Sequence, residues 1–296
     1  MSSDDRKLSL GGSDMAAVMG VSKYRSPLQV FLEKTGLVPG NEGNRFTYWG
    51  TRLEDIVAEE FAKETGKKVV RHNKILRHPR FNFITGNIDR RIVGEPAVLE
   101  CKTASAYKHE AWDGAAPIDY IIQLQHYLML TGAEVGYFAV LIGGNDFRHF
   151  EMKRDDALIR DIEVAAERFW MDHIVTAIPP EANELDNDIL MGMYPTADET
   201  MLELPDNYET ACKIYLEAHQ QESEAKERKE AIKAKLKALI GSNSGAENET
   251  YKVKWSRFEK AAVDLPALRA AHPDIVAQFV RKTPSGTIRI SEIKRK

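Results

Sequence analysis

Several features that define common protein classes are missing from this 296-residue chain or scarce in it. Two cysteines, Cys101 and Cys212, are too few for a four-cysteine zinc or iron–sulfur site, and they fit a reducing compartment. There is no signal peptide, no fixed-period repeat and no apolar run long enough to cross a membrane. The formal net charge is only −4, so a surface that binds nucleic acid has to be local. These absences predict a soluble protein inside the cell.

What the sequence does contain is a core-forming share of 43% hydrophobic residues and, in a very apolar stretch, a pair of acids. The pattern of residues 84–105 predicts two short strands with a tight turn at 94–95, which places Asp89 directly across from Glu100. Facing like charges destabilise a sheet, so the pair requires a cation or a proton. Lys102 leaves the same face of its strand as Glu100. Oxygen ligands held in this way favour magnesium or manganese.

A less specific interpretation of these charges has to be considered. An acid two residues before a lysine occurs at five further positions, and 29% of the residues are charged, so the pattern is typical of a solvated surface. Only Glu100 and Lys102 follow apolar strand residues and face another acid across a turn. On this geometry alone, a metal site and an ordinary surface pair both remain open.

The order of the predicted elements describes a small α/β (α+β) core with a mixed sheet in residues 1–180. Ser13 is placed to cap the first helix. The elements are helices at 11–20, 26–36, 48–66, 119–132 and 156–175, and strands at 67–76, in the hairpin, and at 135–144 and 147–154.

The rest of the chain predicts a linker and an accessory extension. Residues 181–206 are acidic and irregular, which is typical of a linker. The extension, residues 207–296, begins with a long charged helix that ends at Gly241, for which a solvated helix or half of a helical hairpin is the favoured interpretation. It ends in a basic tail that either contacts phosphates or is only solvated.

Two helices carry polar residues that are candidates for a site. Glu54 lies in "WGTRLED", where a surface acid is the default interpretation. In "QLQHY", Gln123 and Tyr127 share a helix face, while Gln125 points away from them. Polar residues in so apolar a helix need partners, and a water or phosphate in a site would supply them.

Five segments of the sequence occur in the order of a known family. This order resembles the YqaJ-type viral recombinase nucleases, which are relatives of lambda exonuclease in the PD-(D/E)xK superfamily, and the resemblance covers residues 8–175. The C-terminal "TIRIS" is a weaker likeness to phage members. The proline often found before the first catalytic acid is replaced here by Ile88. The five segments are "GGSDMAAVMGVSKYRSPLQVFLEKTG", "WGTRLED", "TGNIDR", "LECKT" and "QLQHY".

The resemblance implies a restriction-endonuclease-like core and a metal-dependent mechanism. Asp89, Glu100 and the backbone carbonyl of Cys101 are expected to hold Mg²⁺, with Glu54 contacting the site directly or through water. Lys102 is expected to orient the attacking water and help to deprotonate it, if the metal charge lowers its pKa. Two ions per site are expected, with Mn²⁺ able to substitute, in an in-line attack on a phosphodiester.

The assignment of the helix glutamines stays open between two registers. Gln125 matches the glutamine that binds water or phosphate in lambda exonuclease. Gln123 and Tyr127 match the glutamine–tyrosine pair of the RecB-type nucleases. The sequence does not decide which glutamine faces the site.

Substrate and assembly are implied by the resemblance alone. It implies a 5′-to-3′ exonuclease on linear double-stranded DNA that leaves 3′ overhangs for phage-type homologous recombination, with Arg6, Ser13 and Asn87 at the 5′-phosphate. It further implies a ring-shaped homo-oligomer, commonly a trimer, and a single-strand annealing protein as partner. The location would be the cytoplasm of a bacterial host, with the protein encoded by a phage or prophage and not bound to a membrane.

Two other functions are weighed against this one. The first is an endonuclease or a nuclease that acts on single strands. The second is a DNA-binding recombination scaffold with an inactive core, against which the intact set of Glu54, Asp89, Glu100 and Lys102 argues. Independently of these alternatives, a further hypothesis is that the helix at 207–240 is a docking arm for an annealing protein.

Overall fold

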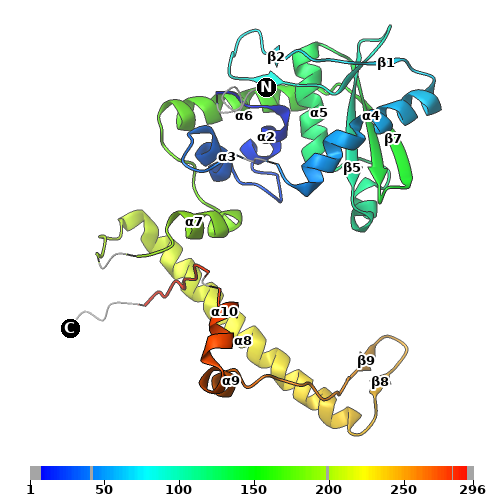
Figure 1. Ribbon diagram of the computed structural model, residues 1–296. Coiled ribbons are helices and arrows are strands. Elements are labelled where there is room, and N and C mark those ends of the chain that lie inside the picture. The colour runs from blue at the N-terminus through cyan, green and yellow to red at the C-terminus, as the bar shows by residue number, and fades with distance from the viewer. Residues whose placement is uncertain (1–7, 41–42, 198–199, 282, 292–296) are drawn as a thin grey trace. The chain divides into compact units, whose positions relative to one another are not determined.

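The chain divides into two compact units, Met1–Leu190 and Met191–Lys296. The computed structural model describes residues 8–40, 43–197, 200–281 and 283–291 (Figure 1). The boundary between the units lies inside the segment 181–206, and the role of that segment as a linker between domains stays a prediction.

The first unit is built on a five-stranded mixed sheet. The strands β5 and β6 are parallel, and the other neighbouring strands are antiparallel. A parallel pair needs a long crossover, which the turn η1 (Ala106–Trp112) and the helix α5 (Ile118–Thr131) supply. In spatial order the strands are β1 (Val69–Arg71), β4 (Arg90–Ile92), β5 (Ala97–Ala104), β6 (Val135–Ile142) and β7 (Asp146–Lys153).

The hairpin of β4 and β5 has the predicted register. Arg90 pairs with Leu99 and Arg91 with Val98, so that continuing the ladder by one step brings Asp89 opposite Glu100. The period-two alternation of the strands and the turn residues were sufficient to fix this pairing.

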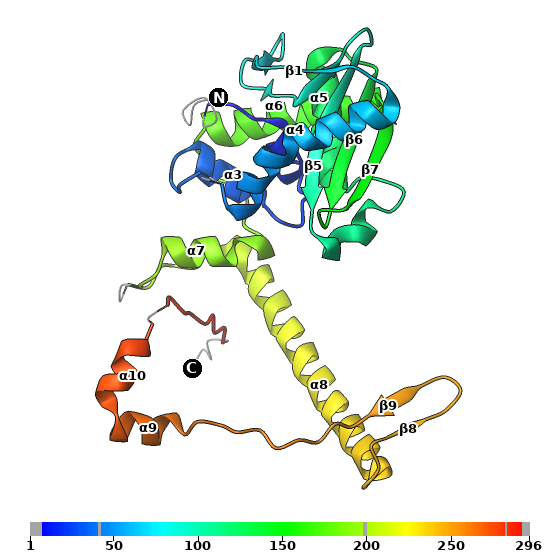
Figure 2. The same ribbon diagram turned by 45° about the vertical axis from the view of Figure 1, so that its right-hand side comes forward.

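Helices cover both faces of the sheet (Figures 1 and 2). The helix α4 (Arg45–Thr65) packs Val57, Ala58 and Phe61 against one face, together with Leu99. On the other face α5 packs with Val98 and with the helix α6 (Asp156–Phe169). Because side chains alternate along a strand, Glu100 and Lys102 share the α5 face with Val98.

Three sequence expectations differ from the structure in the first unit. The helix α2 (Gly12–Val18) has Gly11 as its N-cap, so Ser13 lies inside the helix and does not cap it. The Asp14 carboxylate accepts a hydrogen bond of 2.9 Å from the backbone N–H of Gly11. The expected strand 67–76 is divided, since β2 (Leu76–Arg77) pairs with β3 (Thr85–Gly86) in a separate two-stranded sheet. The expected helix 156–175 changes to a π-helical turn, η2 (Trp170–Val175), after α6.

The segment expected to be irregular is partly ordered. It contains the turn η3 (Glu184–Asp186) and the helix α7 (Asn187–Met193). Asp186 is fully buried and accepts a hydrogen bond from the hydroxyl of Ser26, which precedes the helix α3 (Pro27–Lys34). The expectation of irregular structure is therefore wrong for residues 184–193, because this buried carboxylate ties the segment to the first unit.

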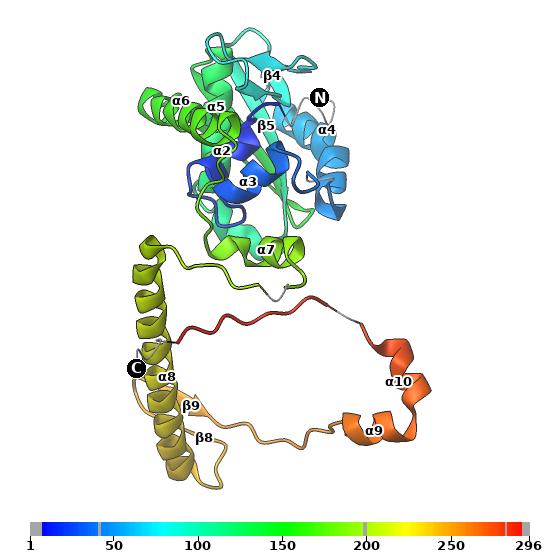
Figure 3. The same ribbon diagram turned by 90° about the vertical axis from the view of Figure 1, so that its left-hand side faces the viewer.

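The second unit consists mainly of one long helix and short elements (Figure 3). The long helix was predicted at 207–240. No helix in the described ranges is both long and apolar enough to span a membrane. The elements are the turn η4 (Asp206–Tyr208), the helix α8 (Glu209–Ile240), the hairpin strands β8 (Gly245–Glu247) and β9 (Lys252–Lys254), and the helices α9 (Leu265–Ala271) and α10 (Pro273–Phe279).

Candidate active site

Two carboxylates face each other at the start of β4, Glu100 buried and Asp89 half-buried. Asp89 Oδ2 accepts a hydrogen bond of 2.8 Å from the backbone N–H of Cys101, the residue after Glu100. Burial and then the charge of Glu100 raise the pKa of Asp89 to about 8. Burial also raises the pKa of Glu100, which is 3% exposed. Asp89 therefore resists ionisation while Glu100 is charged.

A lysine and a glutamine bind one oxygen of this acid pair. Lys102 Nζ donates to Glu100 Oε1 at 2.8 Å and to Gln123 Oε1 at 2.9 Å. Gln123 Nε2 donates to the same Glu100 oxygen and to the hydroxyl of Tyr127, both at 2.9 Å. Burial lowers the pKa of Lys102, but the charges of the acids outweigh it and the net pKa is raised. The ammonium also lies 4.6 Å from the centre of the Tyr120 ring.

Glu54 reaches the same region from α4 and is held by an arginine. Arg90 Nη1 donates to Glu54 Oε1 at 2.5 Å, and Arg90 Nη2 donates to Asp55 at 2.6 Å. Arg90 also donates to the backbone carbonyl of Asp89 at 2.7 Å. The charge of Glu54 contributes to the raised pKa values of Asp89 and Glu100, so these three acids are electrostatically connected.

Arg90 is a site residue that the sequence reasoning missed. Its side chain is only 5% exposed, which is uncommon for an arginine unless it is paired. The available signal was its place directly after Asp89, on an apolar strand that packs against a helix carrying two adjacent acids, Glu54 and Asp55. An arginine with that partner set fixes the position of Glu54 through a planar fork.

The donor set fits a divalent cation at Asp89 and Glu100. Glu100 Oε2 is buried and accepts no hydrogen bond in the described part of the chain. Two carboxylates so placed, one of them with an unpaired buried oxygen, require either a proton or positive charge beyond that of Lys102. No cluster of three or more His, Cys, Asp and Glu side chains suited to a metal occurs in the described ranges, and Glu54 is hydrogen-bonded to Arg90.

Cys101 does not offer its sulfur as a ligand. Its side chain belongs to the core on the α4 face of the sheet. Burial and the neighbouring carboxylates raise the pKa of the thiol, so that it stays protonated. Any contact of Cys101 with a metal would have to involve the backbone, as the resemblance implies.

The structure brings Gln123, and not Gln125, to the acid pair. Gln125 Nε2 donates to the carbonyl of Lys153 at 2.8 Å, and Gln125 Oε1 accepts the N–H of Asp155 at 2.9 Å. Gln125 thus joins β7 to the start of α6. Two positions along a helix correspond to about 200° of rotation, so both glutamines cannot face one site.

Alanine variants of the two glutamines should separate their roles. We expect Gln123→Ala to reduce nuclease activity by roughly tenfold or more, because Lys102 and Glu100 lose a shared hydrogen-bond partner, and a bond to a charged group is worth about 1.5–3 kcal/mol. Gln125→Ala should keep activity per folded molecule and lower the melting temperature instead. Initial rates and thermal unfolding of both variants are the measurements. Loss of activity in Gln125→Ala at unchanged stability would contradict this assignment.

The segments that carry Ser13 and Asn87 meet at Tyr127. Both side chains are exposed. Their neighbours approach the same ring, since a Cβ on Gly12 would lie 2.9 Å from Tyr127 Cε1 and a Cβ on Gly86 would lie 3.1 Å from Tyr127 Cδ1. Glycine is required at both positions for this close approach. Arg6, the third residue expected at the 5′-phosphate, lies outside the described residues.

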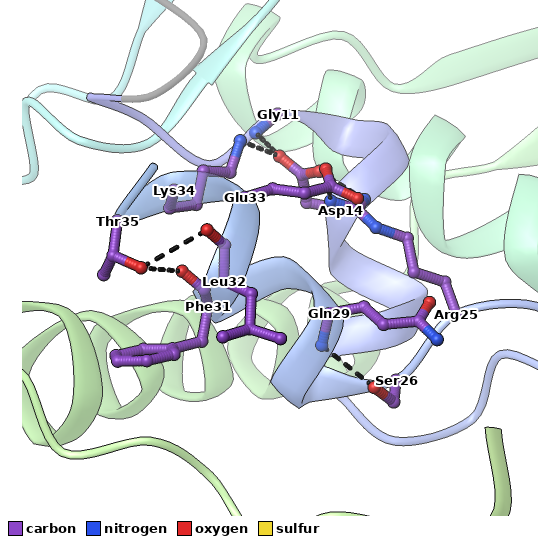
Figure 4. Close-up of polar contacts among 10 residues, drawn as sticks. All are labelled: Gly11, Asp14, Arg25, Ser26, Gln29, Phe31, Leu32, Glu33, Lys34 and Thr35. Atoms are coloured by element: carbon purple, nitrogen blue, oxygen red, sulfur yellow. Dashed lines mark hydrogen bonds and ion pairs between the residues drawn. The ribbon is translucent and has the colours of Figure 1, made fainter. Parts of the chain in front are cut away.

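The start of α2 is held in place by ion pairs of Asp14 with Arg25 and Lys34 (Figure 4). Besides capping the Gly11 N–H, Asp14 accepts hydrogen bonds of 2.7 Å from Arg25 and from Lys34. Burial raises the pKa of Asp14, but the charges of Lys34 and Arg25 lower it below its ordinary value. This ionised carboxylate gives the turn that carries Ser13 a fixed conformation.

Two comparisons of the sequence identify the family. Residues 3–134 match the model of the YqaJ-like viral recombinase domain. The uncharacterized protein YqaJ of Bacillus subtilis (strain 168) is 37% identical over 304 residues, which cover 98% of this chain and 93% of that protein. The chain belongs to the YqaJ family of viral recombinases.

Solved structures support the same fold for this YqaJ-family chain. The alkaline exonuclease LHK-Exo from Laribacter hongkongensis has 24% sequence identity and a TM-score of 0.51, covering 58% of this chain and 90% of its own. The complex of LHK-Exo with dAMP has 23% sequence identity and a TM-score of 0.51, and the match covers 58% of this chain and 91% of that one. The mixed sheet flanked by helices is thus the PD-(D/E)xK fold, as expected from the sequence.

Proposed function

We propose that this YqaJ-family protein is a magnesium-dependent DNA exonuclease of phage-type homologous recombination. The observation that carries the proposal is the pair of half-buried Asp89 and buried Glu100, with Lys102 bonded to Glu100 and the other Glu100 oxygen left without a partner. This arrangement lies on the strand pair of a fold shared with an alkaline exonuclease. A recombinase family and an exonuclease fold together favour a nuclease that acts on DNA.

The residues of this chain would divide the chemistry between them. Asp89 and Glu100 would hold Mg²⁺, which supplies the charge that stabilises the attacking and leaving oxygens of a phosphodiester. The Glu100–Lys102–Gln123 hydrogen bonds keep the ammonium at a fixed place beside the acids. Lys102 would take a proton from an attacking water, provided that a bound cation offset the acid charges that raise the pKa of the lysine. The number of ions, two in the resemblance, stays a prediction, as does replacement by Mn²⁺.

Substrate preference and assembly are further parts of the proposal. Exposed Ser13 and Asn87, whose neighbours Gly12 and Gly86 approach Tyr127, are proposed to contact a 5′-phosphate together with Arg6, which would give 5′-to-3′ polarity and 3′ overhangs. A ring-shaped homo-oligomer, such as a trimer, would keep the enzyme on DNA, and a single-strand annealing protein would receive the product. The reaction would take place in the cytoplasm of a bacterial host.

Digestion of defined DNA substrates tests the proposal. We expect loss of linear duplex in Mg²⁺ or Mn²⁺, fastest with a 5′-phosphate, and no cleavage of a covalently closed circle, because an exonuclease needs an end. A 3′-labelled strand should survive longer than a 5′-labelled one, and Lys102→Ala should be inactive on every substrate.

Other outcomes would assign other functions. Nicking of the closed circle would show an endonuclease, and degradation of single strands alone would show a single-strand-specific nuclease. Binding of DNA without metal-dependent cleavage of any substrate would leave a recombination scaffold.

A further inference from the structure

The helix α8 lacks a partner along almost its whole length. Ile240 is the one residue of its 32 that is buried against the described part of the chain. Large apolar side chains on it lie in solvent, since Ile214 is 60% exposed, Ile232 49% and Leu239 72%. A helix in a protein is stabilised mainly by burying an apolar face, and the described residues of the second unit leave this face uncovered.

Five exposed apolar residues of α8 follow a seven-residue repeat. Such a repeat is typical of a helix that lies along another helix over its full length, here about 48 Å. Alanine at three of the five positions would let the two helix axes approach closely. The repeat consists of Ala211, Ala218, Ala225, Ile232 and Leu239, all of them exposed.

The charges of α8 are divided between its two halves. Residues 209–225 contain four glutamates and one lysine, whereas residues 226–240 contain six lysines or arginines and two glutamates. Complementarity to a helix dipole concerns the first and last turns, yet these charges extend through the middle of the helix. Two copies of such a helix repel each other when parallel and attract each other when antiparallel.

We propose that α8 pairs antiparallel with α8 of a second copy of this chain, about a two-fold axis at Ala225. Ala225 lies at the middle of the helix, so this pairing uses its full length. Ala218 of one copy then lies level with Ile232 of the other, and Ala211 lies level with Leu239. Each large repeat residue meets an alanine, which fills the space between the helices evenly.

The residues beside the repeat match in the same register. Glu222 lies within one residue's rise, about 1.5 Å, of the level of Lys229 of the second copy, and Tyr215 is placed in the same way beside Leu236. A parallel in-register pair would instead oppose Glu222 to Glu222. It would also place alanine against alanine at three levels, where the two side chains are too small to fill the space between the helices. Size and charge therefore select the antiparallel arrangement.

The mass of the full-length chain in solution, measured by light scattering without DNA or metal, tests the pairing. Glu222→Lys should halve the wild-type mass, and adding Lys229→Glu should restore it by exchanging the two charges. Residues 222 and 229 are seven apart and are not neighbours within one helix, so the rescue reports a contact between helices. Glu227→Lys, the same charge change on the opposite face, should keep the wild-type mass. If the first unit also assembles into a ring, the wild type should still have twice the mass of Glu222→Lys, because α8 would join two rings.

Cysteine cross-linking tests the direction. In a Cys212→Ser background, Ala218→Cys combined with Ile232→Cys should give a covalent dimer on oxidation, because levelled positions come within disulfide reach. Ala218→Cys alone should stay uncrosslinked, since the two copies of position 218 lie about 21 Å apart along the axis. A covalent dimer from the single variant would overturn the antiparallel arrangement. The pairing would be overturned if Glu222→Lys had the same mass as the wild type. The same mass would also be found if the wild type did not pair through α8 at all, and DNA or an annealing protein would then be the occupant of this face.

Discussion

Asp89→Asn is expected to abolish magnesium-dependent cleavage and, at the same time, to stabilise the metal-free protein at pH 8. The variant removes one of the two carboxylates proposed to hold the cation. It also removes an acid whose pKa is raised from 3.8 to about 8 by burial and by Glu100. In the folded protein that acid ionises only at the expense of stability.

The direction of the pH dependence follows from this shift. Because the pKa of Asp89 is higher folded than unfolded, its contribution to stability is fully present below about pH 4 and is lost as the pH rises to about 8. The wild-type melting temperature without metal should therefore fall, relative to that of Asp89→Asn, across this range. Above about pH 9 the difference should be constant. Mg²⁺ should raise the wild-type melting temperature more at pH 8 than at pH 5 and leave the variant nearly unchanged.

A matched variant controls for the loss of a negative charge. Asp113, whose side chain is 84% exposed, can be changed to asparagine without touching the acid pair. Asp113→Asn should cleave DNA at the wild-type rate and show no pH-dependent gain in melting temperature. If Asp89→Asn melts below the wild type at pH 8 without metal, the two acids are not in electrostatic conflict.

Lys102→Met should combine inactivity with the opposite effect on stability. Loss of a group that moves a proton costs roughly a hundredfold or more in rate. The variant also leaves Glu100 buried without its cation, and breaking a buried ion pair in this way costs about 3–5 kcal/mol. Metal-free Lys102→Met should therefore melt well below the wild type, whereas Asp89→Asn melts above it.

Added magnesium distinguishes the two losses in Lys102→Met. Without Lys102, a cation bound at Asp89 and Glu100 is no longer repelled by the neighbouring ammonium. Mg²⁺ should therefore raise the melting temperature of the variant most of the way to that of the wild type, without restoring activity. Lys108→Met is the matched control, since Lys108 Nζ donates to the exposed Tyr24 hydroxyl and not to the acids. Restoration of activity by Mg²⁺ alone would show that Lys102 only neutralises charge.

The sequence was most informative where local rules decide the structure. Strand alternation and turn chemistry placed Asp89 opposite Glu100, because a one-residue slip would turn every side chain to the other face. The glutamines of α5 could not be assigned in that way. Which helix face meets the sheet depends on tertiary contacts, here the bonds of Gln125 to β7 and α6.

Long-range pairs account for the remaining differences. Arg90 and Glu54 are 36 residues apart, and no periodicity connects them. Asp186 is buried through Ser26, 160 residues earlier, so a segment with the composition of a linker became ordered. At the start of α2 the sequence offers two neighbouring capping groups, the hydroxyl of Ser13 and the carboxylate of Asp14. The carboxylate is the one used, because Arg25 and Lys34 hold it in place.

The close approach of Gly12 and Gly86 to Tyr127 confines one edge of that ring. Both backbones approach Cε1 and its neighbouring ring atoms without an intervening side chain, and the hydroxyl accepts the hydrogen bond of Gln123 on the side of the acids. A larger residue at either glycine would have to displace the ring, and the displacement would pass through Gln123 to Lys102 and Glu100. Two residues without side chains thus control the position of catalytic groups that they do not touch.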